Sequence, residues 1–148
     1  MLKSGRFAVD LKIPRFFDGI PVVYDGENEP KELEIFEIAM ALVARLIDSS
    51  STSLNILLPN IYFLETDSPE FTLSDDMLGC FHQAIIFPVT KWRTLDLSDF
   101  KILFVMVEEL CHAIWQIPDG PPIEAKVTKV FQQLCPDFSY LEVASRLS

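Results

Sequence analysis

The sequence is poor in positive charge and in cysteine, and it lacks any long apolar run. Of its 148 residues, 12 are Lys or Arg and 22 are Asp or Glu, so the formal net charge is −10. This charge would repel a phosphate backbone, which argues against nucleic-acid binding. No uninterrupted apolar run approaches the ~20 residues that span a bilayer. We therefore expect neither a nucleic-acid partner nor a membrane.

The cysteines and the N-terminal residues indicate a compartment. Cys80, Cys111 and Cys135 are odd in number and widely spaced, and no CxxC pair is present. They fit buried thiols in a reducing cytosol better than a disulfide framework. Near the N-terminus, Asp10 and Lys12 interrupt any signal-peptide core. These features predict a cytoplasmic protein.

The length of 148 residues predicts one domain, 1–148, and hydrophobic spacing predicts one helix and several strands in its first half. Residues 1–30 contain three prolines and three glycines, which favour short extended pieces, with Phe7–Leu11 and Ile20–Tyr24 as candidates. Apolar residues at steps of three and four predict a helix over 31–48, with its inward positions at Leu33, Phe36, Met40, Val43 and Ile47. Ile- and Phe-rich segments between turn formers predict strands within 54–87, namely Leu54–Leu58, Ile61–Leu64, Phe71–Leu73 and Phe81–Phe87.

The second half predicts helices. One covers 99–117, with Asp96 or Ser98 as its N-cap, and its inward stripe comprises Phe100, Leu103, Val107, Leu110, Ile114 and Ile117. Further helices lie within 121–148. The first of them ends near Cys135 with Val127, Val130, Phe131 and Leu134 inward, and a capping-box pattern at Ser139 opens the last. This order predicts an α+β fold in which a small mixed or antiparallel sheet packs on helices.

The segment from Glu108 to His112 is the part of the chain most indicative of chemistry. Glu108 and His112 are four residues apart, so on a helix both side chains project from one face. Helical HExxH motifs use this spacing to give zinc two ligands, with the Glu after the first His as general base. Here Glu108 replaces the first His, which gives EExxH with Glu109 in the position of the base. By itself, ExxxH is frequent by chance on helices and favours a solvated acidic patch beside a structural histidine.

A wider pattern surrounds the motif. The pattern includes Gly79 and Ala84–Phe87 in the predicted strand before the motif, and Phe104, Glu109 and His112 in the helix that carries it. It continues in the next helix with Glu124, Ala125, Leu134 and Pro136. Through these residues, Leu78–Pro136 resembles the ImmA/IrrE family of zincin metallopeptidases. The resemblance implies a zincin-like fold, Glu109 as catalytic base, and Glu108, His112 and Glu124 as metal ligands. It also implies that Phe81–Phe87 is the edge strand that holds substrate.

The chain departs from the family pattern at the first metal ligand and in the segment between the second and third ligands. Glu108 stands where the family has His, and the link Ala113–Ile123 is shorter than is common. Two carboxylates donate more charge to an ion than one does. The pKa of a bound water would therefore stay above the ~7 of efficient zinc sites, and preference would move toward harder ions. We expect either no cofactor or one divalent metal, zinc or a harder ion such as manganese.

These observations leave three functional hypotheses. The favoured one is a metallopeptidase-like protein with a degenerate metal site, which is not proteolytic and acts by binding a protein or peptide partner. The second is an active metallohydrolase or peptidase that uses a Glu/His/Glu site. The third is an unrelated α+β interaction domain in which EExxH is accidental.

Three further residues have simpler interpretations. Asp119 is an alternative third ligand, but its neighbours Pro118 and Gly120 favour a turn role. Cys111 is adjacent to His112, and helical neighbours point about 100° apart, so a buried core thiol is favoured over a nucleophile. His82 is expected to be an ordinary strand residue, able to contact a ligand if a cleft lies nearby.

Overall fold

The computed structural model describes residues 2–50, 54–73, 78–79 and 81–145. Within these residues a four-stranded sheet has the order β1-β2-β3-β4, with β1 at Arg6–Phe7, β2 at Val22–Tyr24, β3 at Asn60–Leu64 and β4 at Ala84–Pro88. β1 is antiparallel to β2, whereas β2, β3 and β4 run parallel. The sheet is therefore mixed, and in the part of the chain described β4 lies at its edge.

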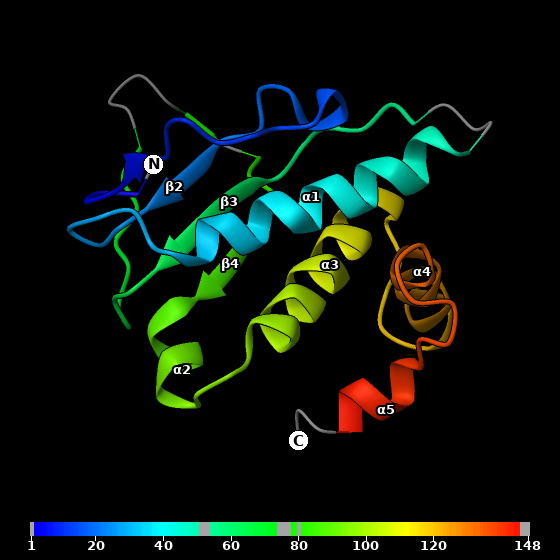
Figure 1. The fold of residues 1–148 in the computed structure, drawn as a ribbon. Helices are drawn as coiled ribbons and strands as arrows, with labels where there is room; N and C mark the ends of the chain where they lie inside the picture. The colour runs from blue at the N-terminus through cyan, green and yellow to red at the C-terminus, as the bar shows by residue number, and fades with distance from the viewer. Residues whose placement is uncertain (1, 51–53, 74–77, 80, 146–148) are drawn as a thin grey trace.

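Five α-helices accompany the sheet in the described residues: α1 (Glu32–Asp48), α2 (Val89–Thr94), α3 (Asp99–Trp115), α4 (Pro121–Gln132) and α5 (Tyr140–Ser145). A short 3-10 helix, η1, covers Arg15–Phe17. α1 lies across the sheet and α3 runs beside it, while α4 and α5 lie beyond α3 (Figure 1). The predicted α+β class with a mixed sheet is confirmed.

Aromatic packing joins α1 to the sheet. The ring of Phe36 on α1 lies 5.6 Å from that of Phe63 on β3 and 5.7 Å from that of Phe87 on β4, measured between centroids. All three side chains are fully buried. Such edge-to-face contacts add specific geometry to the burial of apolar area. The main core therefore lies between the sheet and α1.

The other face of the sheet carries a smaller apolar cluster. Because successive strand residues point to opposite faces, Ile61 and Phe63 join the main core whereas Tyr62 and Leu64 point away from it. Leu2 packs against these two side chains. The N-terminal segment thus covers part of the face that lies opposite the main core.

A second group of aromatic rings attaches α5 to α3 and α4. Phe131 of α4 stacks on Phe138 at 4.7 Å, and Phe104 of α3 lies 5.2 Å from Tyr140 of α5. The hydroxyl of Ser139 accepts a hydrogen bond from the backbone of Glu142, as the capping-box pattern predicts. α5 is therefore held against α3 in the region of the EExxH motif.

The helix predictions are largely confirmed. All five inward positions of 31–48 are buried, and Ser98 caps α3 by accepting from the backbone N–H of Lys101. The predicted inward stripe of α3 is only partly correct. Phe100 is exposed, and the buried face instead includes Ile102, Phe104 and Met106. α3 contacts both α1 and α4, so its buried arc is wider than one stripe. Leu134, predicted inward, is exposed because α4 ends at Gln132.

The strand predictions are less accurate. The predicted strand Ile61–Leu64 corresponds to β3, whereas the one predicted at Phe81–Phe87 begins only at Ala84. The extended pieces predicted at Phe7–Leu11 and Ile20–Tyr24 correspond to the shorter β1 and β2. The strand predictions for Leu54–Leu58 and Phe71–Leu73 were wrong. Leu54–Leu58 forms no strand, and Phe71 forms an isolated bridge with Leu2. Leu54, Ile56 and Leu58 do pack against the core. Their alternation therefore reflects burial of one side of the segment, which has no partner strand within the described ranges.

The cysteine predictions have mixed outcomes. Cys111 is buried, and burial raises the pKa of its thiol to about 12. Cys135 was expected to be buried but is exposed, because it lies beyond the end of α4. Cys80 lies outside the described residues. Separately, none of the helices in the described ranges is long and apolar enough to cross a membrane.

Candidate functional site

α3 presents Glu108 and His112 one turn apart on the same face. Both side chains are partly buried, and the Oε1 atom of Glu108 lies 3.9 Å from the Nε2 atom of His112. The i, i+4 spacing of the EExxH motif produces this proximity directly. These two residues form the sequence-local half of the site.

The chain reversal after α3 supplies a third side chain. Gln116 adopts the left-handed conformation, with φ 53° and ψ 45°, and so ends the helix. The following residues fold back over the last turn, where Ile117 offers its carbonyl oxygen to Nδ1 of His112. Asp119 then places its Oδ1 atom 3.2 Å from Nε2 of the same ring. Glu108, His112 and Asp119 each have one potential ligand atom within 4.8 Å of the others.

The hydrogen bond to Ile117 determines which imidazole nitrogen carries a proton. A carbonyl oxygen can only accept, so Nδ1 of His112 must donate. In the neutral ring, Nε2 then directs its lone pair toward the carboxylates of Glu108 and Asp119. A proton or a cation between these groups would satisfy all three. The donor set, two carboxylates and one imidazole, fits a divalent cation.

Glu124 lies near this group without belonging to it. It is partly buried in the first turn of α4, and its charge contributes to raising the pKa of Tyr140. Among the described residues, the three-membered group contains Asp119 and not Glu124. The structure thus brings together Glu108, His112 and the alternative third ligand. The assignment of Glu124 as a ligand stays a prediction.

Tyr140 is a member of the site that the sequence analysis did not identify. Its hydroxyl donates a hydrogen bond of 3.2 Å to the Oε2 atom of Glu108. Burial, followed by the charge of Glu108 and this hydrogen bond, raises the pKa of Tyr140 to about 12. The capping-box pattern at Ser139 predicted the helix on which Tyr140 lies, but nothing local indicated that α5 would dock beside Glu108.

Glu109 faces a different side of α3, toward the sheet. With His112 it lines a hollow of about 200 Å³, whose opposite wall includes Ala84 and Ile85 of β4. Burial raises the pKa of Glu109; the nearby His112 opposes this shift, and the charge of Glu108 adds to it. A carboxyl group whose pKa is raised in this way holds its proton more readily than an exposed one, as a proton-transfer group does.

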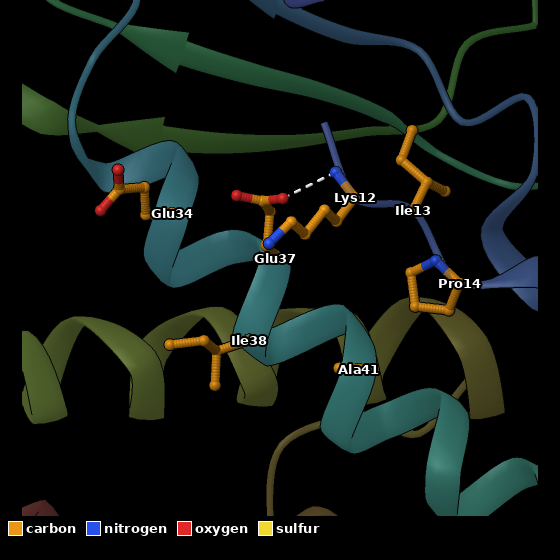
Figure 2. Close-up of a pocket in the computed structure, with 7 residues that line it drawn as sticks. All are labelled: Lys12, Ile13, Pro14, Glu34, Glu37, Ile38 and Ala41. Carbon is orange, nitrogen blue, oxygen red and sulfur yellow. Dashed lines mark hydrogen bonds between the residues drawn. The ribbon is translucent and has the colours of Figure 1, made fainter. Parts of the chain in front are cut away.

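A larger hollow, of about 620 Å³, lies elsewhere, between the N-terminal segment and α1. Figure 2 shows its lining, in which the carboxylate of Glu37 accepts a 2.6 Å hydrogen bond from the backbone N–H of Lys12. Glu34 and Ile38 extend the same exposed surface of α1. None of the EExxH residues lines it. The smaller hollow is therefore the one that two residues of the EExxH motif, Glu109 and His112, line.

Comparisons with known proteins supply no family for this chain. It matches no family model, no curated protein and no solved structure. The functional argument therefore rests on the side chains that α3 and the following turn bring together.

Proposed function

We propose that this chain is a metallopeptidase-like protein of the zincin type with a degenerate metal site, which binds a protein or peptide rather than cleaving it. The observation that carries the proposal is the convergence of Glu108, His112 and Asp119, whose ligand atoms lie within 4.8 Å of one another. This group borders the hollow beside β4 through His112, which belongs to both.

The donor chemistry supports weak binding of a divalent cation. Glu108 and Asp119 provide hard oxygen ligands, and His112 provides one nitrogen. A bound divalent cation would act as a Lewis acid, although two anionic ligands make it a weaker one than the ion of an HExxH site. Oxygen-rich ligation also moves preference from Zn²⁺ toward Mn²⁺. The site is therefore better suited to holding an ion than to efficient hydrolysis.

The edge strand supports the binding of an extended segment. In the part of the chain described, β4 pairs only with β3, so its outer edge faces no further strand. Such edges bind extended peptides through main-chain hydrogen bonds, with pockets that receive alternate side chains. The hollow lined by Ala84, Glu109 and His112 lies where β4 begins. We infer that a peptide partner would lie along β4.

One observation favours the alternative function, an active metallohydrolase. Glu109 lines the hollow in the position that the HExxH pattern gives to the general base, and its burial raises its pKa. Such a carboxyl group would take a proton from an attacking water and return it to the leaving group. In this case Glu109→Gln would abolish the activity of the natural protein.

The test is titration calorimetry of untagged protein with Mn²⁺ and with Zn²⁺, combined with a peptidase assay on unfolded casein. We expect measurable Mn²⁺ binding and no cleavage. Asp119→Asn should weaken cation binding about tenfold or more, because it removes an anionic ligand. The matched control is Glu124→Gln, which neutralises a nearby carboxylate outside the group.

The two variants also separate the competing ligand assignments. If Glu124→Gln abolishes binding and Asp119→Asn does not, Glu124 is the third ligand, as the family resemblance implies. If the natural protein binds neither ion, the metal-site proposal is wrong. Cleavage of casein that depends on Glu109 would establish the hydrolase instead.

A further inference from the structure

A hollow of about 520 Å³ lies on the face of the sheet opposite the main core. Its volume falls within the range of small-molecule sites. Most of its lining is apolar or glycine, and the polar residues come from β3 and the segment before β4. The lining comprises Leu2, Gly5, Phe7, Ile13, Gly19, Ile20, Pro21, Val23, Asn60, Tyr62 and His82.

Among the described residues, this lining contains no Lys, Arg, Asp or Glu, although these make up 23% of the chain. An ion that entered such a hollow would lose hydration without gaining an oppositely charged partner, which is costly. Apolar surface, in contrast, gains from leaving water. The lining therefore selects an uncharged ligand with an apolar body.

Three polar side chains are fixed together within this lining. The Nε2 atom of His82 lies 2.8 Å from the hydroxyl of Tyr62, and its Nδ1 atom lies 3.4 Å from the side-chain nitrogen of Asn60. Asn60 also donates to the carbonyl of Gln83 at 3.3 Å. These contacts hold the polar groups as one cluster rather than scattered over the hollow. A ligand would therefore meet hydrogen-bonding groups at one end only.

We propose that this hollow is a binding site for a small uncharged molecule with an apolar, aromatic-sized body and one hydrogen-bonding end. The apolar body lies among Phe7, Ile20 and Val23, and the polar end donates to the side-chain oxygen of Asn60, whose nitrogen is engaged with His82 and Gln83. The site is separate from the Glu108 group, since the two share no lining residue. It stands whether or not the chain binds a cation.

The experiment uses N-phenyl-1-naphthylamine, an uncharged dye whose fluorescence rises in apolar sites, with two competitors of the same ring system. 1-Naphthol is uncharged at neutral pH, whereas 1-naphthoate carries a negative charge. We expect naphthol to displace the dye at concentrations about tenfold lower than naphthoate, because only the anion loses uncompensated hydration.

Two lysine variants locate the binding. Phe7 is 59% exposed in this lining, and Ile38 is 50% exposed in the hollow of Figure 2, so each tolerates a charged replacement equally well. Phe7→Lys should weaken naphthol binding and strengthen naphthoate binding, whereas Ile38→Lys should change neither. Far-UV circular dichroism verifies that both variants are folded.

A third variant tests the polar end. Asn60→Ala should weaken 1-naphthol binding about fivefold, the usual value of one hydrogen bond, and leave 1-methylnaphthalene binding unchanged. The proposal is overturned if the wild-type protein does not bind the dye. Equal effects of the two lysine variants, or equal displacement by naphthol and naphthoate, would also overturn it, because the dye would then bind exposed apolar surface.

Discussion

The imidazole of His112 donates from Nδ1 to the carbonyl oxygen of Ile117, and this bond turns Nε2 toward two carboxylates. The carbonyl is available because Gln116, between them, has left-handed backbone geometry and reverses the chain. A histidine whose second nitrogen is held by a backbone carbonyl has a fixed tautomer and ring orientation. The turn after α3 therefore fixes the His112 orientation on which the proposed cation site depends.

Replacing Glu108 by His should convert EExxH into HExxH. We expect Glu108→His to raise zinc affinity by more than tenfold, about 1.4 kcal/mol, because a neutral imidazole removes one of the crowded carboxylates and suits zinc. Calorimetry of both forms at one pH measures the change. Equal and tight zinc binding by the natural protein would show instead that the carboxylate site is already functional.

If the proposed cation site exists, Tyr140 should influence its affinity through Glu108. Its hydroxyl donates to Oε2, while Oε1 of the same carboxylate is the oxygen nearer His112. Tyr140→Phe removes this hydrogen bond and keeps the ring that packs on Phe104. We expect Mn²⁺ affinity to fall about tenfold, the lower end of the usual effect of an outer-shell partner. An unchanged affinity with unchanged thermal stability would show that Glu108 needs no support from α5.

The same tyrosine predicts a loss of stability in alkali. Its pKa is raised from 10 to about 12 in the folded chain, so folded protein keeps a proton that unfolded protein releases. Stability that is fully present below pH 10 is lost as pH rises toward 12. Urea unfolding near pH 9 and pH 11 should show the free-energy difference between wild type and Tyr140→Phe shifting in favour of the variant. A constant difference would contradict this pKa shift.

The features that the sequence predicted well are local. The steps of three and four in 31–48 produced α1 with its inward residues buried, and the spacing of Glu108 and His112 placed them on one face of α3. In both cases helical geometry alone relates the residues. No knowledge of a neighbouring element was needed.

The features that the sequence missed depend on long-range docking or on an unusual turn. The position of Asp119 requires the left-handed Gln116, a conformation that nothing about a glutamine indicates. The contact of Tyr140 with Glu108 spans 32 residues and depends on how α5 packs. Leu54–Leu58 has the alternation of a strand, yet its backbone has no ladder partner in the part of the chain that the structure describes. Residue patterns report burial more directly than they report pairing.

Glu109 should make the protein less stable at neutral pH than a neutral side chain would. Burial raises its pKa above the ordinary 4.5, so the fold disfavours the ionised form. Its contribution to stability is present below pH 4.5 and is lost as pH rises through the raised value. Glu109→Gln should therefore increase the thermal midpoint at pH 7 more than at pH 4, in buffer with chelator. The exposed Glu27→Gln is the control and should show no such difference.

The strongest single contribution of charge to the fold should come from Arg93. Its guanidinium contacts both carboxylate oxygens of Glu32 at 3.0 Å and one of Glu65 at 3.1 Å, and so ties α2 to the start of α1 and the residue after β3. Glu32 is 1% exposed, so Arg93→Ala leaves a buried carboxylate without its cation. Because Arg93 itself is 43% exposed, water can reach the gap. We therefore expect the free energy of unfolding to fall by about 2 kcal/mol, below the usual cost of breaking a fully buried pair.

Urea unfolding measures this loss against that of Lys3→Ala, which breaks the exposed pair with Glu70 and should cost under about 0.5 kcal/mol. Equal losses in the two variants would mean that Glu32 does not depend on Arg93 for its place in the core.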